Sequence, residues 1–166
     1  EFRMKTNKKF RDVSAWYHIV VAVDTTQATA SNRVKIYVNG EQLTNFEEAS
    51  YPSQNYDSAI NLNNIQSNIG IRAGTATYFD GCMSHFHLAD GTAYAPTTFG
   101  ETDTTTGIWK PKTAPSVTYG TNGFFLKFEN SGAMGTDSSG NSNNYTIGSG
   151  TMTQLIDTPS NIFATL

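Results

Sequence analysis

The chain has 166 residues, enough for one domain with a full hydrophobic core and too few for two. Only 15% of the residues are charged, and the polarity comes mainly from Thr, Ser, Asn and Gly, which favours strands and turns and argues against a helical bundle. From Asp12 onward thirteen acidic residues outnumber six basic ones, a net charge of −7 that argues against nucleic acid as a partner. No apolar run is long enough to insert into a membrane, and the single cysteine, Cys82, excludes an intrachain disulfide.

The N-terminal segment 1–14 differs from the rest of the chain. It carries five of the eleven basic residues, and it begins with Glu1-Phe2 rather than with Met. We interpret residues 1–14 as a basic leader or as the remnant of preceding strands. We assign residues 15–166 to one β-sandwich domain.

The segment Ala15–Asp24 predicts the first clear strand. Its odd-numbered positions from Tyr17 to Val23 are all apolar, and we expect this face, which includes Ile19 and Val21, to point into the core. The opposite face is apolar enough to be partly covered as well. A strand covered on both sides is typical of a two-layer sandwich.

The next strand is predicted at Arg33–Asn39, where Val and Ile alternate with polar residues and Tyr37. Asn39-Gly40 is the dipeptide best suited to a type I′ turn, because both central residues of that turn have positive φ. We therefore expect a hairpin, with Glu41–Phe46 as the partner strand.

The remainder of the chain contains shorter apolar runs separated by Gly, Asn, Asp and Pro. One helical turn is expected within Tyr94–Glu101, because Pro96 can open a helix at no cost in hydrogen bonds. We expect Phe86 and Leu88 to point inward, as well as Phe124, Leu126 and Phe128. The further strands are predicted at Asn68–Arg72, Cys82–Ala89 and Gly123–Glu129, and more weakly at Tyr145–Ile147 and Met152–Ile156.

The order of these segments resembles a known family. The run WYHIVVAVD followed by VKIYVNG, then NIGIR and YFDGCMSHFHLA, is similar to the central signature of laminin-G-like domains of the concanavalin A-like superfamily. The resemblance implies an all-β, two-sheet antiparallel jelly-roll sandwich. Several strands normally precede the Trp strand in that family and only about fourteen residues do so here. We therefore expect a sandwich lacking its first strands, either as a piece of a longer protein or completed by strands from a neighbouring chain.

The C-terminal half narrows the resemblance. The runs FGETDTTTGIWKPK, YGTNGFFLKF, GTDSSGNSNNYT and DTPSNIFATL are similar to virion-surface proteins of marine tailed phages. This implies a non-catalytic bacteriophage module at the virion surface, such as part of a tail fibre, that adheres to host surface glycans. Its partners would be other virion proteins and copies of itself. The alternatives are a purely structural capsid or tail decoration and a glycan-degrading enzyme.

Catalysis of glycan hydrolysis requires two suitably spaced carboxylates. The nearest approach is Glu101 and Asp103, which we interpret as solvated loop acids, so no catalytic residue is assigned. His85-x-His87 forms half of a zinc site at most, since zinc needs three or four ligands and His18 could join only through tertiary structure. We expect these to be ordinary outward-facing histidines.

Two binding sites remain as hypotheses. Residues 137–144 offer side-chain oxygens with a glycine at the bend, which suits calcium; the alternative is a loop whose side chains bond their own backbone. Glycan binding needs aromatic faces with polar neighbours. The candidate calcium ligands are Asp137, Ser139, Asn141 and Asn143, and the candidate carbohydrate-binding residues are Tyr78, Asp80, Trp109, Tyr119 and Asn141.

Overall fold

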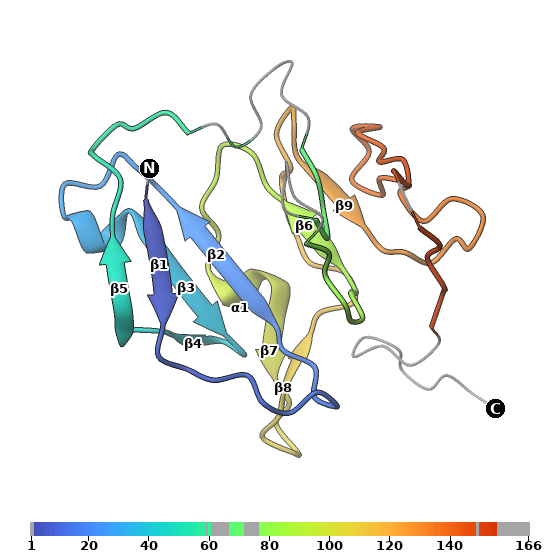
Figure 1. Cartoon of the computed structure of the whole chain (residues 1–166), viewed down its shortest axis with the longest axis horizontal. Coiled ribbons are helices and arrows are strands. Elements are labelled where there is room, and N and C mark those ends of the chain that lie inside the picture. Colours follow the sequence, from blue (N-terminus) through green and yellow to red (C-terminus); the bar gives the residue numbers. More distant parts are fainter. Residues whose placement is uncertain (1, 59, 61–66, 72–76, 149, 156–166) are drawn as a thin grey trace.

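A computed structural model describes residues 2–58, 60, 67–71, 77–148 and 150–155 (Figure 1). Within these residues, regular structure is almost entirely β, with one 3-10 helix and one short α-helix. The elements in chain order are β1 (Arg3–Thr6), β2 (Ile19–Val23), η1 (Ala30–Asn32), β3 (Val34–Val38), β4 (Glu41–Gln42), β5 (Phe46–Ser50), β6 (Phe86–Leu88), α1 (Pro96–Phe99), β7 (Gly100–Thr102), β8 (Trp109–Pro111) and β9 (Phe124–Leu126).

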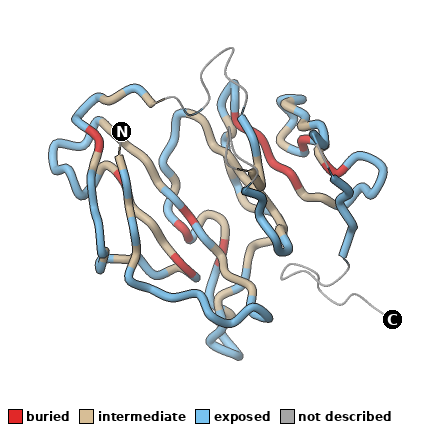
Figure 2. Tube along the Cα trace, viewed as in Figure 1, coloured by how far each residue is buried: buried red, intermediate tan, exposed pale blue. Residues whose placement is uncertain are grey.

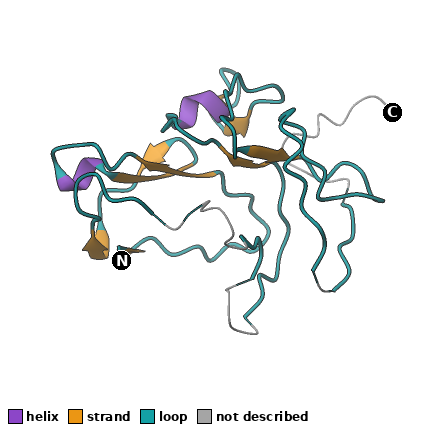
Figure 3. Ribbon diagram, turned by 90° about the horizontal axis from the view of Figure 1, so that it is seen from above, coloured by secondary structure: helices purple, strands orange, loops and turns teal. Residues whose placement is uncertain are grey.

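Every strand pair that the described residues form is antiparallel. The pairs join β1 to β5, β2 to β3 and β3 to β4, β6 to β9, and β7 to β8. Seen from above, β2 and β3 lie in one layer with β6 and β9, and α1 stands on one side of that layer (Figure 3). The β1–β5 pair lies on the other side. The predicted all-β antiparallel fold class is confirmed.

The hairpin after β3 forms as the sequence predicts. Asn39 and Gly40 both have positive φ, 51° and 83°, as a type I′ turn requires. The partner strand is shorter than expected, because β4 ends at Gln42. The chain then turns away, and Phe46 begins β5, which pairs with β1. The strand β1 therefore lies within the segment 1–14, which we interpreted as a basic leader or as the remnant of preceding strands.

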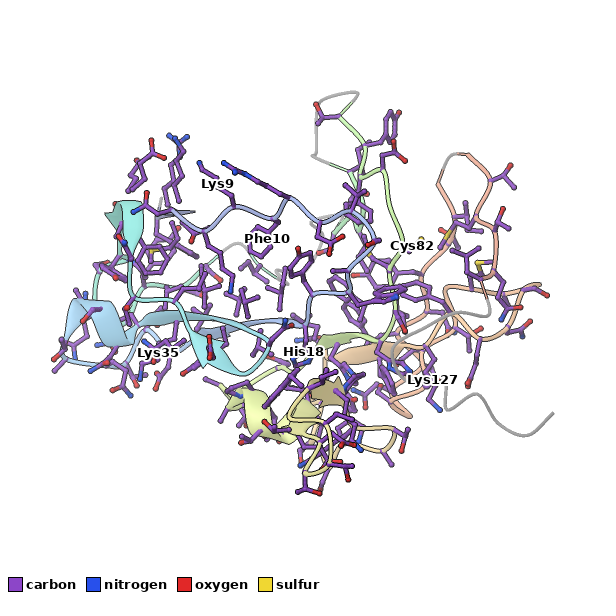
Figure 4. All side chains as sticks on the ribbon, turned by 90° about the horizontal axis from the view of Figure 1, so that it is seen from below. Lys9, Phe10, His18, Lys35, Cys82 and Lys127 are labelled. Atoms are coloured by element: carbon purple, nitrogen blue, oxygen red, sulfur yellow. The ribbon has the colours of Figure 1, made fainter. Side chains whose placement is uncertain are left out.

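The expectation that Ile19 and Val21 point into a closed core is wrong. Both residues are 56% exposed, whereas Val20 on the opposite face is 9% exposed. The opposite face is covered by the part of the chain that carries α1 and β8. Phe10 lies above this layer, on the side away from Lys35 (Figure 4). Phe10 is itself 41% exposed, so the face that carries Ile19 and Val21 is incompletely covered. On the same face, Val38 is nevertheless buried.

The densest part of the core surrounds β9, whose three residues are all buried (Figure 2). The ring of Phe124 stacks on that of Phe86 in β6, with centroids 5.9 Å apart. Phe124 also packs against Tyr145, although residues 145–147 form a loop and not the predicted strand. The prediction for Phe128 is wrong in part: the strand ends at Leu126, and Phe128 has φ of 59° and is half-buried.

Three other predictions have mixed outcomes. The helical turn is confirmed as α1, with Pro96 in its first turn. Of the expected strand at Asn68–Arg72, only a single bridge between Ile71 and Tyr78 forms, and Arg72 lies outside the described residues. Residues 152–155 form no strand, and Ile156 also lies outside the described residues. The helices of the described part have three and four residues, too few to cross a bilayer.

Candidate functional site

Trp109 packs on the hairpin between β3 and β4 and connects it to the C-terminal half of the chain. Its ring lies over Gly40 and Gly100, where an added Cβ would come within 2.4 Å and 2.6 Å of ring atoms. The indole Nε1 donates a hydrogen bond to Nδ1 of His18 at 3.0 Å. Burial lowers the pKa of His18, which favours the neutral acceptor form that this bond requires. Trp109 is thus a packing residue, and the prediction that it offers a free face to a sugar does not fit its position.

His87 is packed inside an aromatic cluster. Its ring stacks on Phe125 with centroids 3.9 Å apart, and its Nδ1 lies 2.8 Å from the hydroxyl of Tyr119. Burial, together with the nearby His85 and His18, lowers the pKa of His87 to about 4. Burial also raises the pKa of Tyr119, to about 12.

His87 in β6 and His85 just before it are not outward-facing as expected, since both are half-buried. His85 also packs against Phe125, with ring centroids 5.6 Å apart. Among the described residues, no three His, Cys, Asp or Glu side chains are placed to share a metal ion. Tyr119, with its hydroxyl bonded to His87, is a structural partner in this cluster.

Asp137 organises the loop that follows β9. Its Oδ1 accepts hydrogen bonds from the backbone N–H groups of Phe125 and Ser139, both at 2.8 Å. Its Oδ2 accepts from the Ser139 hydroxyl at 2.8 Å and from the Asn143 N–H at 2.9 Å. Burial raises the pKa of Asp137, but these hydrogen bonds outweigh burial and lower the pKa overall.

The neighbouring amides complete this loop. Asn141 donates to the carbonyls of Gly120 and Gly123, and Asn143 donates to those of Thr121 and Gly123. The carboxylate and amide groups thus bond the protein itself, which matches the loop alternative. A calcium ion needs six to eight oxygens, and it would compete with four hydrogen bonds for the one carboxylate. The donor set therefore does not fit a calcium site in this arrangement.

The other predicted carbohydrate-binding residues do not form one site. Tyr78 is 60% exposed and forms the bridge with Ile71, and Asp80 is also exposed nearby in the chain. Asn141 reaches the carbonyl of Gly120, next to Tyr119, but its amide is already bonded. Of the five residues, only Tyr78 and Asp80 remain open to a ligand.

The acidic pair considered for catalysis stabilises the β7–β8 hairpin. Asp103 accepts hydrogen bonds from the N–H groups of Thr105 and Thr106, and from Lys110 Nζ at 2.9 Å. The bond from Lys110 is the largest of the causes that lower the pKa of Asp103. Glu101 Oε1 lies 3.9 Å from the same ammonium. A carboxyl group with a strongly lowered pKa is a poor proton donor, so Asp103 is poorly suited to act as the general acid that glycoside hydrolysis needs.

The structure also contains an aromatic pocket that sequence reasoning missed. It has a volume of about 200 Å³ and lies between the β2–β3 hairpin and the segment before α1. Tyr37 and Tyr94 supply aromatic rings, and polar side chains surround them. The lining residues are Ala22, Asp24, Gln27, Asn32, Lys35, Tyr37, Ala93, Tyr94 and Ala95.

A second, larger groove, of about 380 Å³, lies between the end of β1 and the turn before β5. It is lined by Leu43 and by polar residues, with no aromatic ring. The aromatic pocket is therefore the better candidate for a site that recognises an organic ligand. The sequence predicts one part of this pocket, because the alternation of β3 places Lys35 and Tyr37 on the same face. The sequence does not predict that Tyr94 lies beside them.

Comparison with known proteins identifies the family. The family model described as the concanavalin A-like lectin/glucanases superfamily, of the laminin-G type, matches residues 1–97. No curated protein and no solved structure gives a significant match. The matched region covers more than half of the chain and contains β1, Trp16 with the following strand β2, and the Asn39-Gly40 hairpin. The chain belongs to the concanavalin A-like lectin/glucanase superfamily.

Proposed function

We propose that this protein is a non-catalytic carbohydrate-binding module on the surface of a bacteriophage virion, in a tail fibre or a similar appendage, where it adheres to host glycans. The family name covers lectins, which bind sugars, and glucanases, which cleave them. The aromatic pocket is the observation that carries the binding part of the proposal. It combines two tyrosine rings with several polar groups, the combination that sugar rings require.

The non-catalytic part is supported by the state of the acidic residues. Asp103 and Glu101 share Lys110 within a hairpin, and neither of them lines the aromatic pocket or the larger groove. The phage context is supported by the resemblance of the C-terminal segments to virion-surface proteins. Other virion proteins and further copies of the chain are the partners that this context implies.

A glycan array tests adhesion directly. The intact protein should bind a restricted set of host surface polysaccharides above background, both with chelator and with millimolar calcium. Polysaccharide incubated with the protein should keep its length, as measured by size-exclusion chromatography. An array with no binding in either condition would refute adhesion, and depolymerisation that survives in a Glu101→Gln, Asp103→Asn double variant would indicate an enzyme with other catalytic residues.

A structural decoration is the second candidate, and one observation favours it. Ile19 and Val21 are each 56% exposed on one sheet face. A neighbouring subunit would bury such a face. Mapping the buried surface in a particle reconstruction separates the candidates: contacts over Ile19 and Val21 alone leave the aromatic pocket free, whereas contacts over Tyr37 and Tyr94 rule out adhesion through the pocket.

A further inference from the structure

The floor of the aromatic pocket is set by the register of the β2–β3 pair. Ala22 lies opposite Lys35, and Val20 lies opposite Tyr37, so these four residues share the sheet face that looks toward α1. Lys35 is labelled on this layer in Figure 4. The small side chain of Ala22 leaves the space beside Lys35 and Tyr37 that the pocket occupies.

The opposite wall is held rigidly. The hydroxyl of Tyr94 accepts a hydrogen bond from the N–H of Thr118 at 2.9 Å and lies 3.4 Å from the Thr118 carbonyl. The rings of Tyr94 and Phe99 of α1 also form a T-shaped contact, with an interplanar angle of 84°. Since the Tyr94 ring is already ordered, little conformational entropy is lost when a ligand packs against it.

The loop wall is ordered as well. Asp24 Oδ1 accepts from the N–H and hydroxyl of Thr26, and Oδ2 accepts from the amide of Gln27 at 2.6 Å. Arg33 donates to the carbonyls of Gln27 and Ala28, both at 2.8 Å. The carboxylate in this pocket is therefore largely satisfied by its own loop.

Three other polar side chains of the pocket are not satisfied in this way. Within the described residues, the ammonium of Lys35, the side-chain amide of Asn32 and the hydroxyl of Tyr37 have neither a hydrogen bond nor an ion pair. The pocket also carries the negative charge of Asp24, but the oxygens of that carboxylate already accept hydrogen bonds from Thr26 and Gln27. Lys35 is therefore the charged group of the pocket that is open to a ligand, accompanied by two neutral hydrogen-bonding groups. A ligand matching this set carries an anionic group and hydroxyls on a ring that packs against tyrosine.

We propose that the pocket between Tyr37 and Tyr94 binds one acidic sugar unit of the hexuronate class, with the sugar carboxylate on Lys35 Nζ and the ring against the two tyrosines. This inference rests on the proposed carbohydrate-binding function and adds the site and the ligand class. The volume of about 200 Å³ lies below the roughly 300–1,000 Å³ of sites for drug-sized ligands, so a single ring occupies it.

The test uses matched pairs of methyl hexuronides and methyl hexosides with gluco, galacto and manno configuration. The members of each pair differ only in a carboxylate in place of a hydroxymethyl group. Binding to the full chain is measured by ligand-observed NMR titration. At least one hexuronide should bind more tightly than its hexoside, by about fivefold at low salt, and the preference should shrink as salt is added.

Variants connect this preference to the pocket. Lys35→Met should abolish the preference for the hexuronide while leaving weak binding of the hexoside, and Lys35→Arg should retain it. Tyr37→Ala should weaken both ligands of the pair. Lys9→Met, on the other side of the β2–β3 layer (Figure 4), is the matched control and should change neither. Thermal unfolding of each variant confirms that it is folded.

The outcomes separate this inference from the proposed function. Equal affinity within all three pairs, or a preference that survives Lys35→Met, overturns the assignment of an acidic sugar to this pocket. Glycan-array binding that persists in Tyr37→Ala and Lys35→Met places the sugar elsewhere, which refutes the pocket and leaves the adhesive function standing. An array without any binding by the intact protein overturns both.

Discussion

Asp137 allows a quantitative test of how the loop after β9 contributes to stability. The side chain is 9% exposed, and its carboxylate accepts four hydrogen bonds between 2.8 Å and 2.9 Å. Asp137→Ala removes all four acceptor interactions and leaves the buried N–H of Phe125 without its partner. A hydrogen bond to a charged group contributes about 1.5–3 kcal/mol, but the bonds are coupled and water can replace those at the rim. We therefore expect a loss of about 3–5 kcal/mol in the free energy of unfolding.

Asp137→Asn separates charge from shape. The amide oxygen can still accept from Phe125 and Ser139, while its NH₂ group would face the N–H of Asn143, so one bond and the charge are lost. The expected loss is about 1–2 kcal/mol. Asp57→Ala, at an exposed position, is the control and should stay within about 0.5 kcal/mol of wild type.

Urea denaturation followed by circular dichroism measures these differences, with thermal unfolding as a second readout. For a chain of this size, a loss of 3–5 kcal/mol corresponds to a decrease in Tm of roughly 10 °C. A decrease below about 1 kcal/mol for Asp137→Ala would refute the view that this carboxylate organises the loop.

Three further predictions follow from contacts described above. Gly40→Ala should lower the free energy of unfolding by about 2–4 kcal/mol in urea denaturation, because the new Cβ meets the Trp109 ring. Gly91 has the same φ of 83° but open space around it, so Gly91→Ala is the control. If Gly91→Ala destabilises the protein as much as Gly40→Ala does, the steric argument is wrong. His87 should lower the free energy of unfolding by about 2–3 kcal/mol as pH decreases from about 6.5 to about 4, because the unfolded state takes up a proton that the folded state excludes. If the free energy of unfolding depends on pH to the same extent in His87→Gln, the pH dependence comes from other groups. Millimolar calcium should leave Tm unchanged relative to EDTA, and an increase of several degrees would show that the loop after β9 rearranges to bind the ion.

Local features of the fold were predictable because they depend on neighbouring residues alone. The Asn39-Gly40 turn requires only two residues that tolerate positive φ, and Pro96 opens α1 for an equally local reason. The alternation of β3 correctly indicated that Val34 and Val38 are buried. The same rule was misleading for β2, because periodicity shows which residues share a face and not how well that face is covered.

Site residues were less predictable because the relevant contacts join distant parts of the chain. Trp109 could have been a sugar platform or a packing residue, and only its position over Gly40 distinguishes the two. Tyr37 and Tyr94 are brought together by the docking of the segment before α1 onto the hairpin. The loop at Asp137 was assigned two alternatives with the same residues, and the hydrogen bonds from Phe125 and Ser139 favour the self-bonded one.

The position of Trp109 has a consequence for biosynthesis. Trp109, which covers the hairpin between β3 and β4 and donates a hydrogen bond to His18, is translated 91 residues after that histidine. The hairpin therefore leaves the ribosome long before its cover exists, and contacts of such high sequence separation form slowly. Nascent chains stalled before Trp109 should be sensitive to proteases and prone to bind chaperones, and protection should increase once the β7–β8 hairpin has emerged.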